Sequence, residues 1–91
     1  VKDSGRIRIL ENILPAMKTA IEMYVIQRVK EIRIRKGLSQ AALADCLNLS
    51  KGFIGDVENP KSRAKYNLNH LNEIAKIFNC SISDLLPEQP L

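Results

Sequence analysis

The middle of the chain repeats one arrangement of apolar and polar positions twice. Ser39 and Ser50 each occupy a position suited to a helix N-cap, where the hydroxyl accepts a hydrogen bond from a backbone N–H of the first turn. A leucine precedes each serine and an apolar residue follows it four positions later, which is the spacing of a hydrophobic staple. Asn48 lies between the two units, and asparagine adopts the left-handed backbone conformation more readily than most residues. The pattern predicts helices over residues 40–47 and 51–58, joined by a tight turn as in a helix-turn-helix.

Apolar residues three or four positions apart predict one long helix before this unit, from Pro15 to Lys36. The positions expected to face inward are Met17, Ile21, Val25, Val29 and Ile32. Gly37 suits the residue just beyond a helix C-terminus, because glycine adopts positive φ without strain. Further upstream, residues 6–10 alternate between polar and apolar, which fits either a short strand or the first turn of a helix.

Two more helices are expected downstream. Asn67 is the expected N-cap of the first, and Asn79 is its expected terminating residue. The positions expected to face inward in this helix are Leu71, Ile74, Ala75 and Phe78. Ser81 and Asp84 have the spacing of a capping box, which predicts a short final helix that carries Leu85 and Leu86 and stops at Pro87. The predicted fold class is all-α, with five helices and an N-terminal extension.

The chain has 91 residues, which is enough for one small domain. We expect three parts: an extension over residues 1–22, a helix-turn-helix domain over residues 23–86 and a tail over residues 87–91. The apolar residues of the extension must be buried against the domain itself or against a second copy of the chain in a dimer. The sequence leaves both alternatives open.

The composition limits the kinds of chemical site that the chain can contain. Hydrophobic residues make up 45% of the chain, so a core can form without disulfides or metal. Cys46 and Cys80 have no second pair and no histidine cluster, which indicates reduced cysteines and no metal site. His70, the only histidine, has no nucleophile or metal partner in the pattern, so we expect a surface residue, no enzyme and no cofactor. Without a membrane-length apolar run or a signal peptide, a soluble cytoplasmic protein with no membrane partner is expected.

Charge is distributed unevenly. The net charge is +4, with +3 over residues 23–47, +2 over residues 48–66 and −2 over residues 67–91. Charge alone favours an ordinary solvated surface. Next to a helix-turn-helix, the same basic region is what a DNA-binding protein requires.

The chain resembles the Cro/C1-type helix-turn-helix family, also called XRE-like, over roughly residues 23–86. The resemblance rests on the segments Gly37–Ala44, Asn48–Ile54, Val57–Asn59, Leu71–Phe78 and Cys80–Leu86. It implies a phage-repressor-like domain that binds double-stranded DNA as a homodimer. The second helix of the motif would lie in the major groove, with half-sites about one turn of DNA apart.

The resemblance also implies roles for individual residues. Gln40 would grip a phosphate. The positions that face bases are Ser50, Lys51, Gly52 and Asp56, and those that follow the DNA backbone are Asn59, Lys61, Ser62, Arg63 and Lys65. Phe53 would either touch a thymine methyl group or pack partly in the core. Arg33 and Glu58 match a buried ion pair of some relatives.

Two interpretations of function remain. The first is a sequence-specific, dimeric transcription regulator. The alternative is an antitoxin or a helical interaction module, in which the motif contacts a protein partner. The acidic Asp56 and the glycines of residues 51–58 support the second interpretation.

Overall fold

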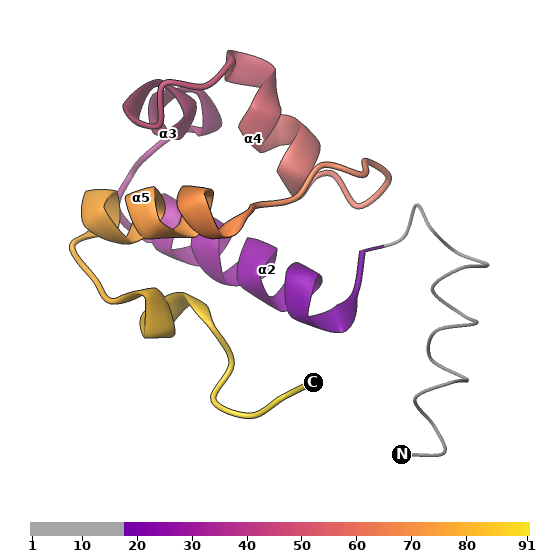
Figure 1. The fold of residues 1–91 in the computed structure, drawn as a ribbon. Helices are drawn as coiled ribbons and strands as arrows, with labels where there is room; N and C mark the ends of the chain where they lie inside the picture. Colours follow the sequence, from indigo (N-terminus) through magenta and orange to yellow (C-terminus); the bar gives the residue numbers. More distant parts are fainter. Residues whose placement is uncertain (1–17) are drawn as a thin grey trace.

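The computed structural model describes residues 18–91, which form four α-helices, one 3₁₀ turn and no strand. The helices are α2 (Ala20–Arg35), α3 (Gln40–Cys46), α4 (Lys51–Glu58) and α5 (Leu68–Phe78), and the 3₁₀ turn η1 spans Ile82–Leu85. In Figure 1, α3 and α4 form a pair above the crossing of α2 and α5, and η1 lies below them. The all-α prediction is confirmed. The predicted strand or turn over residues 6–10 lies outside the described residues.

The core forms where the apolar stripes of the helices meet. α2 packs against α4, α5 and η1, while α3 packs mainly against α4. The buried residues include the predicted inward positions Val25, Val29, Ile32, Leu71, Ile74, Ala75 and Phe78, together with Leu43, Ala44, Ile54, Val57 and Leu85. Burying a large aliphatic or aromatic side chain stabilises a fold by about 1.5–3 kcal/mol. Ala44 has no exposed surface, so a larger side chain there would push α3 away from α4.

The predicted turn residues have the required backbone conformations. Asn48, between α3 and α4, has φ of 56°, and Asn79, after α5, has φ of 54°. Gly37, after α2, has φ of 73°. The hydroxyl of Ser39 accepts a hydrogen bond from the Ala42 N–H at 3.0 Å, as predicted for an N-cap.

The predicted start of the long helix is wrong. Thr19 is the N-cap of α2: its hydroxyl accepts from the Glu22 N–H at 3.3 Å, and the Glu22 carboxylate accepts from the Thr19 N–H at 2.8 Å. This capping box begins the helix at Ala20 and not at Pro15. Ile21, predicted to face inward, is 44% exposed, because it lies in the first turn before α2 enters the core. Met17 lies outside the described residues.

Three smaller predictions also need correction. Ser50 occupies the N-cap position of α4, but its side chain makes no capping hydrogen bond. The last element is a 3₁₀ turn that ends before Leu86, because its capping box orders only one turn ahead of Pro87. His70, predicted to be exposed, is half-buried, and its Nδ1 accepts from the Asn67 N–H at 3.0 Å.

Candidate nucleic-acid interface

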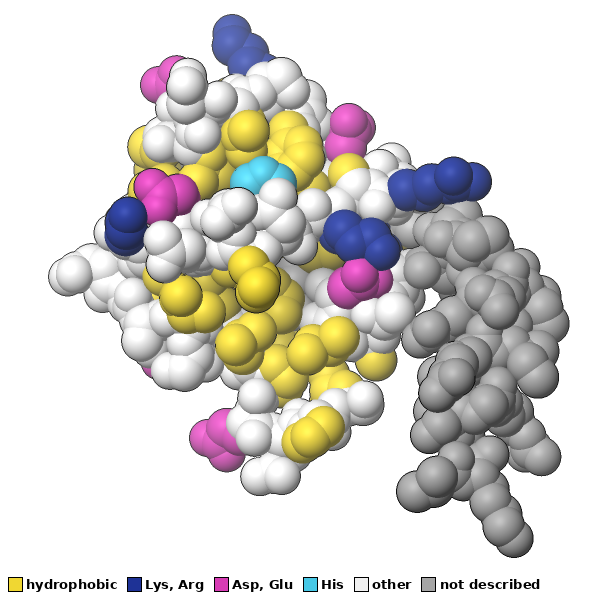
Figure 2. Space-filling view, in the orientation of Figure 1, with side chains coloured by type: hydrophobic (Ala, Val, Ile, Leu, Met, Phe, Trp, Pro, Cys, Tyr) yellow, Lys and Arg dark blue, Asp and Glu magenta, His cyan; other side chains and the backbone are white. Residues whose placement is uncertain are grey.

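α4 divides into a buried face and an open face. Ile54 and Val57 have no exposed surface, so they fix the helix on the core. Lys51, Gly52 and Asp56 are exposed on the opposite side. Apart from its chain neighbours and the nearby backbone of its own helix, no atom lies within 4 Å of the place where a Cβ on Gly52 would stand, so another molecule can approach the backbone there. Figure 2 shows Lys and Arg side chains over the ends of the α4 region.

The orientation of α4 is set by a buried ion pair. Arg33, on α2, donates from Nε and Nη2 to the two carboxylate oxygens of Glu58, at 3.0 and 2.9 Å. The side chains of Arg33 and Glu58 are only 8% and 4% exposed. Arg33 also donates from Nη1 to the Leu38 carbonyl at 2.8 Å. These bidentate hydrogen bonds and the bond to Leu38 join α2, the α2–α3 turn and the end of α4. Arg33 and Glu58 form the buried ion pair that the family resemblance implied.

Gln40 belongs to the same network. Its Nε2 donates to Oε1 of Glu58 at 2.9 Å, which draws the side chain across α4. A Cβ on Gly55 would stand 3.3 Å from Oε1 of Gln40, so the glycine leaves room for this amide. Gln40 is nevertheless exposed as a residue. The structure therefore holds its amide at the edge of the open face, with one donor engaged.

Phe53 packs against aromatic residues of its own domain. Its ring centroid lies 5.0 Å from that of His70 and 6.3 Å from that of Tyr66. Phe53 is half-buried, which agrees with partial core packing. Contact with a thymine methyl group stays a prediction.

The loop after α4 is shaped by its own side chains. Oδ1 of Asn59 accepts from the Lys61 N–H at 3.0 Å, and Oγ of Ser62 accepts from the Ala64 N–H at 3.1 Å. These bonds hold the exposed Lys61 and Arg63 on a short ordered turn beside the end of α4. Across the whole predicted set, the exposed residues are Gln40, Ser50, Lys51, Gly52, Asp56, Asn59, Lys61, Arg63 and Lys65, and the half-buried ones are Phe53 and Ser62.

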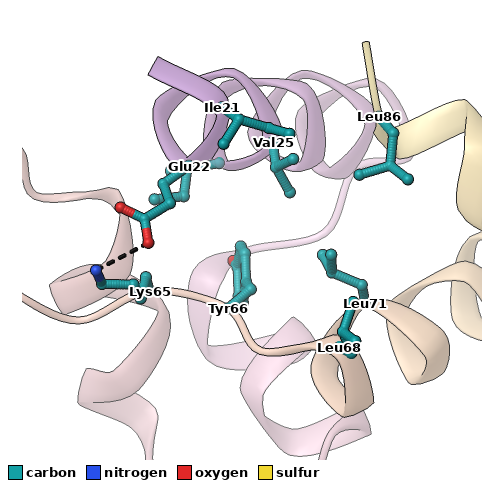
Figure 3. A pocket seen from close by; sticks show the side chains of 9 residues that line it. Ile21, Glu22, Val25, Lys65, Tyr66, Leu68, Leu71 and Leu86 are labelled. Carbon is teal, nitrogen blue, oxygen red and sulfur yellow. Dashed lines mark ion pairs between the residues drawn. The ribbon is translucent and has the colours of Figure 1, made fainter. Parts of the chain in front are cut away.

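Lys65 is already engaged. Its Nζ lies 2.8 Å from Oε2 of Glu22, as the dashed line in Figure 3 marks, and the two side chains are 45% and 25% exposed. Burial by itself would raise the pKa of Glu22, but hydrogen bonds from Lys65 and Thr19 outweigh it and lower that pKa. Local sequence patterns did not predict this pair, because its members are far apart in the chain.

Lys18 is the cation that sequence reasoning missed. Its Nζ donates to the backbone carbonyls of Val57 at 2.7 Å and Asn59 at 2.8 Å. These carbonyls lie at the C-terminal end of α4. Only the tertiary structure brings Lys18 to this point, 39 and 41 residues away in sequence.

Other chemistry is limited in the described part of the chain. Residues 18–91 hold no cluster of three His, Cys, Asp or Glu side chains arranged for a metal ion. The thiol of Cys46 is exposed and that of Cys80 is half-buried, and burial raises the pKa of Cys80. None of the helices between residues 18 and 91 has the length and apolar content needed to cross a membrane.

Residues 28–89 match the Cro/C1-type HTH DNA-binding domain. The chain belongs to this family. The family prediction is therefore confirmed, and residues 28–89 are a Cro/C1-type DNA-binding domain.

Individual relatives agree with this assignment. The chain is 35% identical over 71 residues to the immunity repressor protein of Bacillus phage phi105, a match that covers 76% of this chain and 46% of that protein. The chain thus spans less than half the length of this relative. Among solved structures, the Cro/C1-type domain is similar to the restriction-modification controller protein C.AhdI from Aeromonas hydrophila. That similarity has a TM-score of 0.61 and 28% identity, and it covers 70% of this chain and 94% of C.AhdI.

The same fold also occurs within a larger protein. Hydroxypropylphosphonic acid epoxidase from S. wedmorenis is similar with a TM-score of 0.66 and 24% identity, over 77% of this chain and 36% of the epoxidase. This second similarity shows the fold alone.

Proposed function

We propose that the chain is a sequence-specific transcription regulator that binds double-stranded DNA as a homodimer and reads the major groove with α4. One observation carries the proposal: α4 is fixed from below by Ile54 and Val57, which are fully buried, and presents polar side chains outward. Lys51 can donate to O6 and N7 of a guanine, and Asp56 can accept from N4 of a cytosine. Gly52 permits close approach of the helix backbone to the base edges.

Backbone contacts complete the proposed interface. Lys61 and Arg63 are exposed on the loop that follows α4, where they can pair with phosphates along one strand. Gln40 would contribute from the start of α3, and Lys65 would do so by exchanging Glu22 for a phosphate. Such contacts position the domain, while the α4 side chains choose the sequence.

An apolar surface supports the dimer. A groove of about 180 Å³ lies between α2, Tyr66, the start of α5 and Leu86 (Figure 3). Ile21 and Leu68 line it and are 44% and 79% exposed, and Figure 2 shows a continuous apolar area below α5. A second copy of the chain that covers this area would remove it from water. The proposed division is an extension over residues 1–22, which would reach this dimer contact through Ile21, a DNA-binding domain over residues 23–86 and a tail over residues 87–91.

Selection of bound sequences from a random DNA pool tests the proposal most directly. We expect a site with two-fold symmetry and half-sites about one helical turn apart. If each subunit neutralises about four phosphates, a log–log plot of affinity against salt should have a slope of about −3.6 per subunit. A flat salt dependence, or no enriched sequence, would exclude the regulator. Analytical ultracentrifugation tests the dimer separately, and a monomer at all concentrations would exclude it.

The second candidate is an antitoxin or interaction module whose α4 contacts a protein. The exposed Asp56 favours it, because this carboxylate would repel phosphates. Co-purification of a protein that competes with DNA, and that is lost in an Asp56→Ala variant, would support this function. An antitoxin that also represses transcription would give both results.

A further inference from the structure

α4 is poorly stabilised by its own residues. It contains eight residues, including Gly52 and Gly55, and glycine is unfavourable within a helix. The side chain of Ser50 makes no capping bond at its start, and its last turn contains no basic residue. The helix that the proposed function assigns to base recognition therefore needs support from elsewhere in the fold.

Lys18 supplies that support at the C-terminal end. The carbonyls at the end of a helix lack partners within the helix, and the helix dipole makes this end negative. The Asn59 N–H bonds to the carbonyls of Gly55 and Asp56, which leaves the Val57 carbonyl to be satisfied from outside. Nζ of Lys18 donates to Val57 at 2.7 Å and to Asn59 at 2.8 Å, so one ammonium group holds both the end of α4 and the start of the loop.

The contact also ties α4 to the beginning of α2. Lys18 directly precedes Thr19, the N-cap of α2, whose capping box fixes the backbone there. Partial burial lowers the pKa of Lys18, with partial opposition from Glu22. Lys18 lies upstream of the family match, which begins at residue 28.

We propose that Lys18 is a positioning residue for DNA recognition, which fixes the C-terminal end of α4 and the adjoining loop relative to α2. The proposal rests on the proposed function, since it assigns DNA recognition to α4. Lys18 acts through the backbone of Val57 and Asn59 and does not itself contact DNA. Loss of the Lys18 ammonium group should let the end of α4 fray. It should reduce affinity for the specific site more than affinity for DNA in general.

The test compares three variants of the full chain. Lys18→Met removes the ammonium group and keeps the length of the side chain, whereas Lys18→Arg keeps a cation with several donors. Lys30→Met is the matched control, because Lys30 lines the same hollow between α2 and the end of α4 and makes no hydrogen bond or ion pair within residues 18–91. Each variant is titrated with the selected DNA site and with random-sequence DNA, at several salt concentrations and well below its unfolding temperature.

For Lys18→Met we expect affinity for the selected site to fall about fivefold more than for Lys30→Met, the effect of losing a charge-assisted hydrogen bond at a partly exposed position. Affinity for random DNA should fall equally in both variants, and Lys18→Arg should recover the specific affinity. Amide hydrogen exchange at Gly55 to Asn59 should be faster in Lys18→Met alone.

Three results would overturn the proposal. If the ratio of affinity for the selected site to affinity for random DNA is the same in Lys18→Met and Lys30→Met, the contact does not affect recognition. A salt slope reduced by about 0.9 in Lys18→Met alone would make Lys18 a direct phosphate contact. Unchanged hydrogen exchange at the end of α4 would show that the contact does not hold the helix. If the wild-type chain selects no DNA, both the proposed function and the role of Lys18 in recognition are excluded. The hydrogen-exchange measurement then still decides whether Lys18 holds the end of α4.

Discussion

Replacement of Glu58 by Gln should destabilise the fold more than any other single conservative change at the interface. The amide keeps the size and shape of the carboxylate but removes its charge. Arg33 would then remain charged with a side chain only 8% exposed, opposite a neutral partner. Loss of one partner from a buried pair usually costs about 3–5 kcal/mol, because the remaining charge stays desolvated.

The geometry supports a cost near the middle of that range. Glu58 accepts three hydrogen bonds, two from Arg33 at 2.9 and 3.0 Å and one from Gln40 at 2.9 Å. Small domains have a free energy of unfolding of about 5–15 kcal/mol, so a loss of about 4 kcal/mol is a large fraction of the total. For a chain of this size it corresponds to a fall in Tm of about 15–30 °C.

Urea unfolding followed by circular dichroism measures the effect. The control is Glu73→Gln, which breaks an ion pair with Lys76 whose side chains are 53% and 68% exposed, and which should leave the unfolding midpoint unchanged. The double variant Arg33→Met with Glu58→Leu should recover most of the loss, because both charges are removed together. A loss below about 1 kcal/mol for Glu58→Gln would refute the view that this pair is a desolvated link between α2 and α4.

Three further predictions concern the open face and the core beneath it. Lys51→Ala should relax base preference at one position of the selected site, whereas Lys65→Ala should weaken binding to all DNA sequences alike. Affinities for a panel of single-base variants of the site distinguish the two effects. If both substitutions change these affinities in the same way, the assigned roles are wrong. Gly52→Ala should stabilise the chain to urea by up to about 1 kcal/mol, since a Cβ there meets no atom within 4 Å, and should still weaken DNA binding by preventing close approach. The pKa of Tyr66 is raised, chiefly by burial and also by Glu58, and its hydroxyl has no hydrogen-bond partner within residues 18–91. Above pH 10.0, the ordinary tyrosine pKa, the unfolded chain loses the Tyr66 proton before the folded chain does, so the free energy of unfolding falls as pH rises. Above that pH, the urea midpoint should therefore fall more steeply in wild type than in Tyr66→Phe.

Most of the fold could be predicted because its signals are local. The cap at Ser39, the left-handed conformation of Asn48 and the stripe of α5 each depend on residues within a few positions of one another. The capping box of Thr19 and Glu22 was equally local and equally visible. It was missed because the apolar spacing continues past it to Met17, and spacing alone does not say where a helix begins.

The candidate site could be predicted only in part. The exposure of Lys51 and Asp56 follows from the periodicity of α4, since Ile54 and Val57 must face the core. The engagement of Lys65 by Glu22 depends on tertiary structure, because the partners are brought together only when the loop before α5 lies against the start of α2. No periodicity or cap encodes such a pair.

The contacts of Lys18 determine where this domain could be joined to another protein. A version trimmed to start where the family match begins, at residue 28, would discard the first half of α2 and the ammonium group that secures the end of α4. Val25 and Ile26, which are buried, would be lost with it. Fusion proteins that use this domain should therefore be joined upstream of Lys18, since the packed unit is larger than the segment that the family match covers.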